Sequence, residues 1–195
     1  MKKILTLSSL LLTVAVAAHA QDPMGGLGFR SGPTVSTATL GFSASPTIGV
    51  RQWFTGQFGG DLAVGFASIT AENNGIKTDE GTGFAFDLGL PISLKSWDKV
   101  NFIFRPGFTF VSATLKDKTS PTPPNELKGT GLSVSGELEV EWMLADKVSI
   151  SAAHGIAYNS LKLEDNDSPA GELKLNGFNS TGENFTQLGF HVYLW

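Results

Sequence analysis

The sequence has 195 residues, no cysteine, and a formal charge of −4 from 14 basic and 18 acidic side chains. The lack of cysteine excludes a disulfide scaffold, a thiol nucleophile and a Cys-ligated metal site. A mildly acidic chain without a basic run also argues against a nucleic-acid partner.

The first twenty residues have the pattern of a secretory signal. Lys2 and Lys3 form a positive start, residues 4–18 are apolar, and Ala18-His19-Ala20 is a small-x-small cleavage site. We therefore predict a signal peptide over residues 1–20 and one mature domain over residues 21–195. Cleavage would take the formal charge to −6, because twelve basic residues would then oppose eighteen acidic ones. With no cysteine at the cleavage site, we expect an exported chain without a lipid anchor.

Alternation of apolar and small or polar residues with period two dominates the rest of the chain. No apolar run there approaches the roughly 20 residues that a membrane helix needs. The alternation predicts eight strands, near residues 34–43, 47–54, 57–70, 82–94, 99–115, 130–144, 147–160 and 185–195. One bent strand over residues 34–54 is an alternative that would leave seven, and the even numbers of bacterial barrels favour eight.

The predicted connections alternate in length. Short turns are expected near 55–56, 95–98 and 145–146, and longer polar loops over 71–81, 116–129 and 162–182. Strands of this length fit the roughly 9–11 residues that cross a bilayer when tilted. The pattern predicts an all-β fold, an eight-stranded antiparallel up-and-down transmembrane barrel with short periplasmic turns and longer extracellular loops.

One face of each predicted strand is bulky and the other is small or charged. Residues 82–94 place Phe84 and Phe86 on one face, and Ala85 and Asp87 on the other. A soluble lipocalin-like barrel would turn the bulky face inward, but an eight-stranded lumen has room only for its own side chains. We therefore expect the bulky face to contact lipid.

Three features of the predicted strands carry further expectations. Pro91 and Pro106 interrupt strands of a closed sheet, so a bulge is expected near each. His154 falls on the lipid-facing register. Each tryptophan lies at or just beyond the short-turn end of a strand, which predicts an interfacial aromatic rim of Trp53, Trp97, Trp142 and Trp195.

The inward register collects charged residues in the half of the barrel nearest the short turns. These are Arg51, Asp61, Asp87, Arg105, Glu137, Glu139 and Glu141. Because a lone buried charge costs several kcal/mol, we expect Arg51 to pair with Asp61, and Arg105 with Asp87 or Glu139. The network is interpreted as a structural plug of the lumen or as a gate or constriction that favours cations.

The chain resembles the eight-stranded outer-membrane β-barrel family, the OmpA-like and OmpX-like porin-type barrel domains. The resemblance rests on the run from Ser45 to Phe54 (SPTIGVRQWF), on Asp61-Leu62-Ala63-Val64-Gly65 with Asp87-Leu88-Gly89-Leu90, and on the aromatic C-terminus. In that family a terminal aromatic residue with another two positions earlier is part of the assembly signal. The resemblance thus implies that Tyr193 and Trp195 are read by the barrel-assembly machinery.

These patterns favour a non-enzymatic barrel in the outer membrane that supports envelope integrity or surface interaction. The alternative is a narrow porin-like channel for ions or small solutes through the charged lumen. The expected partners are outer-membrane lipid and lipopolysaccharide, together with a surface ligand that the sequence does not identify. No catalytic site, metal or cofactor is predicted, because no serine–histidine pair with a base is suggested by the strand spacing.

Overall fold

The computed structural model describes residues 25–30, 47–73, 76–117, 125–165, 172–181 and 187–194. The predicted signal peptide, the predicted strand at 34–43 and Trp195 lie outside these residues. No helix in the described part is long and apolar enough to cross a membrane.

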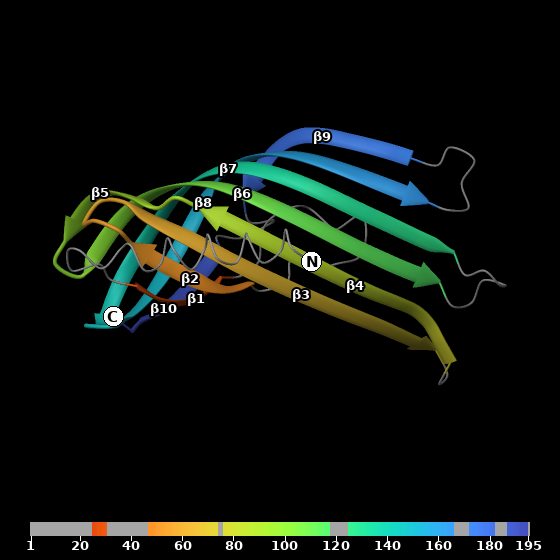
Figure 1. Cartoon of the computed structure of the whole chain (residues 1–195), viewed down its shortest axis with the longest axis horizontal. Coiled ribbons are helices and arrows are strands. Elements are labelled where there is room, and N and C mark those ends of the chain that lie inside the picture. The colour runs from red at the N-terminus through yellow and green to blue at the C-terminus, as the bar shows by residue number, and fades with distance from the viewer. Residues whose placement is uncertain are drawn as a thin grey trace, which may run out of the picture.

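The described residues form ten strands in one antiparallel sheet (Figure 1). Their bounds are β1 Gly25–Arg30, β2 Thr47–Trp53, β3 Gly59–Asn73, β4 Ile76–Gly89, β5 Ile92–Trp97, β6 Val100–Asp117, β7 Glu126–Ala145, β8 Val148–Asp165, β9 Glu172–Thr181 and β10 Gln187–Tyr193.

The sheet closes into an eight-stranded barrel. β4 and β5 both pair with β6, so they occupy one position in the wall, and β9 and β10 share the position beside β8. β1 pairs with β10 on one side and β2 on the other, which closes the ring. Seven of the eight expected strands therefore match the structure, and the all-β barrel is confirmed.

The strand that closes the ring is β1, at residues 25–30, and the strand expected at 34–43 lies outside the described residues. Its sequence alternates inward glycines with outward Leu27 and Phe29. A Cβ on Gly26 would overlap the backbone at Val192, so glycine lets β1 lie close against β10. The strand is six residues long and half of its residues are glycine. So few side chains do not give a recognisable alternation of apolar and polar residues.

The predicted long loops are wrong in extent, because most of their residues continue the strands. β3 and β4 pair as far as Asn73 and Ile76, and β6 and β7 pair as far as Lys116 and Glu126. β8 and β9 likewise pair over much of the third predicted loop. We call this continuation of the strands the polar extension; it lies at the end opposite the short turns (Figure 1).

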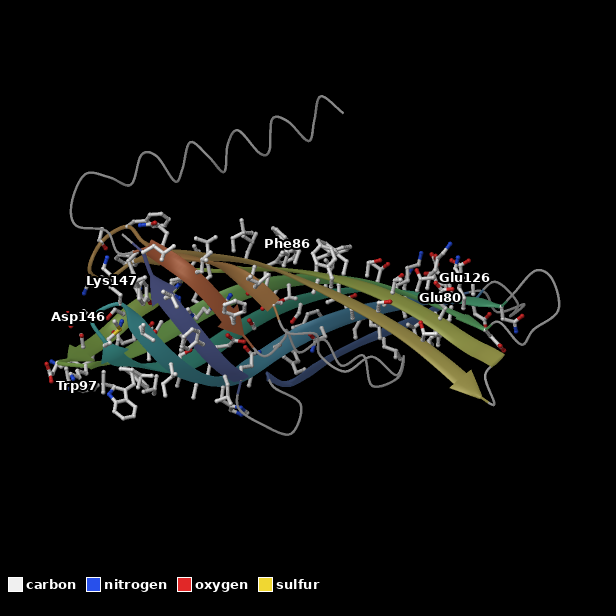
Figure 2. All side chains as sticks on the ribbon, turned by 90° about the horizontal axis from the view of Figure 1, so that it is seen from below. Glu80, Phe86, Trp97, Glu126, Asp146 and Lys147 are labelled. Atoms are coloured by element: carbon white, nitrogen blue, oxygen red, sulfur yellow. The ribbon has the colours of Figure 1, made fainter. Side chains whose placement is uncertain are left out.

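The polar extension was predicted as loops because its alternation is reversed. On β8 the inward side chains Leu161 and Leu163 pack beside Ala113, while Lys162, Glu164 and Glu172 pair on the outward face. An alternation rule that assigns apolar residues to the lipid face predicts loops for such segments. Figure 2 shows the charged Glu80 and Glu126 at this end, and Trp97 and Lys147 at the other.

The two prolines of the wall lie beside the same break in the ladder. Pro91 separates β4 from β5, and the pairing of β5 with β6 shifts by one residue between Ser93 and Lys95. The bulge expected near Pro91 is therefore confirmed. Pro106 pairs in register with Gly136, so the bulge expected there is wrong. The carbonyl of Pro106 accepts a hydrogen bond from the N–H of Leu90, so Pro106 faces the break that Pro91 makes between β4 and β5. The hydrogen bond that a proline nitrogen cannot donate would fall at that break.

The faces of the wall are as the alternation predicts. Outward Phe104, Leu138 and His154 are exposed on the surface, while Ile103, Glu137 and Ala153 beside them in sequence are buried inside. Phe86 points away from the barrel in Figure 2. An apolar band therefore surrounds a polar lumen, which is the arrangement of a barrel that sits in lipid.

Candidate functional site: the charged lumen

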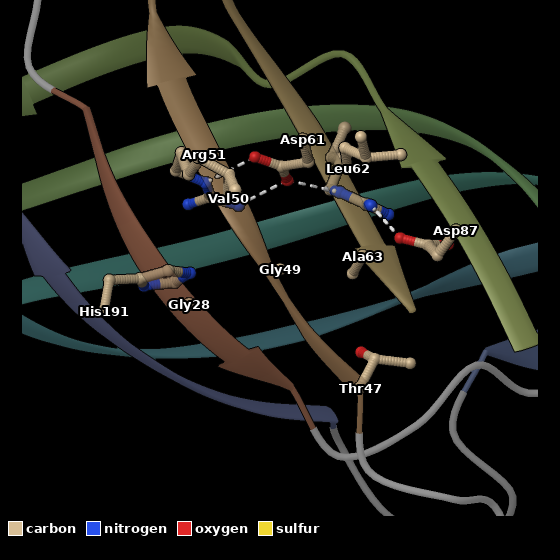
Figure 3. Close-up of a pocket in the computed structure, with 11 residues that line it drawn as sticks. Gly28, Thr47, Gly49, Val50, Arg51, Asp61, Leu62, Ala63, Asp87 and His191 are labelled. Atoms are coloured by element: carbon tan, nitrogen blue, oxygen red, sulfur yellow. Dashed lines mark hydrogen bonds and ion pairs between the residues drawn. The ribbon is translucent and has the colours of Figure 1, made fainter. Parts of the chain in front are cut away.

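The charged lumen consists of the seven residues that the inward register predicts. They come from β2, β3, β4, β6 and β7, and every one is buried: Arg51, Asp61, Asp87, Arg105, Glu137, Glu139 and Glu141. Figure 3 shows Arg51, Asp61 and Asp87 on neighbouring strands, pointing into the barrel and joined by ion pairs through a second guanidinium.

Arg51 binds carboxylates on both sides of the lumen. Its Nε and Nη2 donate to the two oxygens of Asp61, at 2.8 and 2.9 Å, on the adjacent strand. Its Nη1 and Nη2 donate to the two oxygens of Glu139, at 3.0 and 2.9 Å, on β7. Two bidentate pairs on one guanidinium fix its plane and tie β2 and β3 to the opposite wall.

Arg105 is the second centre of the network. Its Nε donates to Asp61 at 2.8 Å, its Nη1 to Glu137 at 3.3 Å, and its Nη2 to Asp87. Asp61 thus joins the two arginines. A Cβ on Gly89 would overlap the guanidinium, so this glycine leaves the space in which Arg105 lies against β4.

The structure brings together all seven predicted lumen residues, with one change of partner. Glu139 binds Arg51. From the sequence we expected either Glu139 or Asp87 as the partner of Arg105. Arg51 and Asp61 pair directly across β2 and β3, as do Arg105 and Glu137 across β6 and β7. Register explains these two contacts, but contacts across the lumen depend on barrel curvature, which alternation does not give.

A cluster around Glu141 was not foreseen. Its Oε1 accepts hydrogen bonds from the hydroxyls of Ser149 and Tyr193, each at 2.6 Å, and lies 3.4 Å from Nδ1 of His191. That nitrogen is also 3.3 Å from Ser149 Oγ. The signal was present in β10, where outward Leu188, Phe190 and Val192 alternate with inward His191 and Tyr193.

The hydroxyl of Ser149 in this cluster is enclosed. Ser149 is fully buried, and its hydroxyl donates to Glu141 beside the ring of His191. Tyr193, which the family resemblance assigns to an assembly signal, points into the lumen and binds Glu141. Nothing in the structure tests its role in assembly.

The aromatic rim contains fewer tryptophans than predicted. Trp97 and Trp142 are 55% and 51% exposed near the short turns, as an interfacial rim requires. Trp53 is 7% exposed and packs inside with Ile103 and Tyr193, so its assignment to the rim is wrong. It lies two residues after inward Arg51 and so shares the inward face.

Two cavities lie along the lumen. The inner one, of about 20 Å³, is lined by both arginines, Asp61, Asp87 and His191, and has room for about one water. The outer one, of about 260 Å³, lies at the short-turn end and is lined by Trp53, Thr55, Gly56, Ser96, Asp98, Lys99, Val100, Asn101, Glu141 and Met143.

Ion pairs also run across the outer face of the polar extension. Lys162 lies 2.6 Å from Glu164 and 3.0 Å from Glu172, and Lys174 lies 2.8 Å from Glu172. Hydrogen bonds from Lys174 and Lys162 lower the pKa of Glu172, while those to Glu164 and Glu172 raise the pKa of Lys162. These exposed pairs contribute little to stability individually.

Comparison with known proteins supports the fold and gives no specific function. No family model and no curated protein matches the chain. The structure is similar to that of a major outer membrane protein from Thermus thermophilus, with 12% identity, a TM-score of 0.51, and coverage of 89% of this chain and 100% of that one.

Two further structures match over most of their length at lower similarity. CarO2 of Acinetobacter baumannii is 10% identical, with a TM-score of 0.41 and coverage of 88% of this chain and 98% of that one. OprG, an outer membrane protein of Pseudomonas aeruginosa, is 12% identical, with a TM-score of 0.39 and coverage of 88% and 95%. The closed ring of strands and the match to the Thermus thermophilus protein together show that the chain has the fold of an eight-stranded outer-membrane barrel.

Proposed function

We propose that this protein is a non-enzymatic outer-membrane barrel with a sealed lumen, which anchors the polar extension at the membrane surface and so supports envelope integrity or surface contact. The observation that carries the proposal is the packing of the two lumen arginines. Arg51 and Arg105 are each 2% exposed and are each held by several carboxylates. Side chains fixed in this way leave no continuous path for solute.

The length of the strands supports a role outside the bilayer. β7 has 20 residues and β6 and β8 have 18 each, whereas roughly 9–11 residues cross a membrane. The remaining residues carry the charged outward face of the polar extension. A barrel whose role lay only within the bilayer would not need these additional strand residues. A barrel that presents a charged surface outside the bilayer would need them.

The lumen chemistry supports a role without catalysis. Its nucleophilic hydroxyl, on Ser149, is enclosed, and its carboxylates are engaged with guanidiniums or hydroxyls. Residues that bind one another this closely stabilise a barrel and are poorly placed to exchange protons with a substrate.

Swelling of proteoliposomes in an isotonic solution of a small sugar tests the proposal. Vesicles with the refolded chain should swell no faster than vesicles without protein. Vesicles with a known porin at the same protein-to-lipid ratio serve as the positive control. Swelling of the test vesicles well above the protein-free rate would refute a sealed lumen.

A narrow cation pathway is the second candidate, because five lumen carboxylates face only two guanidiniums. The inner and outer cavities lie on that route, and an acidic wall lowers the electrostatic barrier to cations. A cation pathway would give vesicles that leak potassium but not sugar. Glu139→Gln would then change the ion selectivity while folding is kept.

A further inference from the structure

We propose that the outer cavity at the short-turn end of the lumen is a binding site for a small organic cation, a protonated amine in chemical class. The proposal goes beyond a sealed barrel, because binding in this cavity requires no transport. It rests on the shape of the cavity, on the state of one oxygen of Glu141, and on the local charge.

The cavity has a size and lining suited to a small molecule. Its volume is about 260 Å³, far more than the inner cavity's 20 Å³. Trp53 and Met143 give it apolar walls, and Asn101 and Glu141 give it polar groups. Thr55 and Ser96 add further polar groups, so the lining combines an apolar wall with several polar groups that can orient a ligand.

Glu141 has one oxygen engaged and one available to a ligand. Its Oε1 accepts from Ser149 and Tyr193 and lies near His191. Its Oε2 takes no hydrogen bond from the described residues; the nearest cation there is Nη1 of Arg51 at 3.8 Å. The carboxylate is thus held rigidly on one side while its other oxygen serves the cavity that Glu141 lines.

The charge around the cavity favours a cation. At its rim Asp98 and Lys99 are adjacent and opposite in charge, so Glu141 sets the sign of the interior. Arg51, at 3.8 Å from Oε2, does not fully neutralise it, because that guanidinium is also bidentate with both Asp61 and Glu139. An ammonium group at Oε2 would supply a closer partner, and the indole of Trp53 would add an attractive aromatic surface for a cation.

The rim of the cavity offers a clean way to block it. Gly56 lines the cavity, and a Cβ added there meets no atom within 4 Å. A Phe at this position would fill the mouth from an exposed turn without disturbing the lumen network. Gly56→Ala, which adds one methyl in open space, is the matched control.

Isothermal titration of the refolded full chain in detergent micelles with benzylammonium chloride tests the site. We expect saturable binding at one site, with benzyl alcohol, the neutral analogue of similar size, at least about tenfold weaker. Glu141→Gln should weaken benzylammonium binding by a similar factor, while Glu126→Gln on the polar extension should leave it unchanged. Gly56→Phe should abolish it, and Gly56→Ala should not.

Three outcomes would overturn the proposal: no saturable binding to the native chain, equal binding of the alcohol and the ammonium, or binding that survives Gly56→Phe. The last variant decides the matter if Glu141→Gln fails to fold, since it leaves the network intact. The result is independent of the sealed lumen, because a barrel that conducts can still bind the amine and a sealed barrel can fail to.

Discussion

Removal of the Arg51 side chain should destabilise the barrel strongly. Arg51→Met keeps much of the volume but takes away four hydrogen bonds, two to Asp61 and two to Glu139. Asp61 keeps its contact with Arg105, so most of the loss falls on Glu139, which is 0% exposed. Loss of one partner of a buried ion pair typically costs about 3–5 kcal/mol.

A double-mutant cycle separates this pair from general disruption. Glu139→Gln removes the charge that Arg51 neutralises, so the double variant should be less destabilised than the sum of the two single variants, with a coupling energy of about 1–3 kcal/mol. The assay is urea unfolding in lipid vesicles, followed by tryptophan fluorescence. The exposed pair Lys162–Glu172, treated in the same way, should show a coupling below about 1 kcal/mol.

Effects of Arg51→Met and Glu139→Gln that add to within about 0.5 kcal/mol would refute a coupling between these two side chains. That result would mean that water, and not the arginine, stabilises Glu139. It would also remove the physical ground for describing the lumen as plugged by this network, whatever the folded barrel looks like.

Three further predictions concern faces, space and pH. Leu138→Arg on the lipid side should cost about 2–4 kcal/mol in bilayer unfolding; no loss would reverse the assignment of faces. Gly89→Ala should displace Arg105 and cost about 1–3 kcal/mol in the same assay, whereas Gly83→Ala, with its nearest atom at 3.7 Å, should be nearly neutral. The pKa of Glu172 is lowered in the folded state. The stability that ionised Glu172 gives to the pairing of β8 and β9 is therefore present above the ordinary carboxyl pKa and is lost as the pH falls through the lowered value. The protection of β8 and β9 amides against hydrogen exchange, measured relative to the intrinsic exchange rate at each pH, should therefore fall there, and protection that does not depend on pH would contradict the pairing.

The sequence predicts the barrel well where alternation follows the membrane. Phe104 and Leu138 lie outward, and Glu137 and Glu139 lie inward. The sequence predicts these faces because the outer side of the wall contacts lipid and the inner side contacts a narrow polar lumen. The same rule finds all seven lumen charges, since each lies between two bulky outward neighbours or next to one.

The misses have physical reasons that alternation cannot express. The strand at Gly25–Arg30 is defined by the close approach of glycine backbones, and the polar extension reverses the order of apolar and charged faces. Trp53 was placed in the rim because it lies at a strand end. It lies two residues after Arg51, however, and therefore points to the same, inward face of the strand. The His191 contacts follow from the pairing of β10 with β8, which sets His191 opposite Ser149, and of β8 with β7, and alternation within one strand does not specify this register.

Single-channel recording of the refolded chain in a planar bilayer tests the central claim, that the Arg51 and Arg105 network seals the lumen. With a sealed lumen, the protein should insert, as shown by its resistance to protease in the same membrane, and yet pass no steady current. Stable openings whose cation selectivity changes with Glu139→Gln would contradict that claim and would make the lumen charges the wall of a channel.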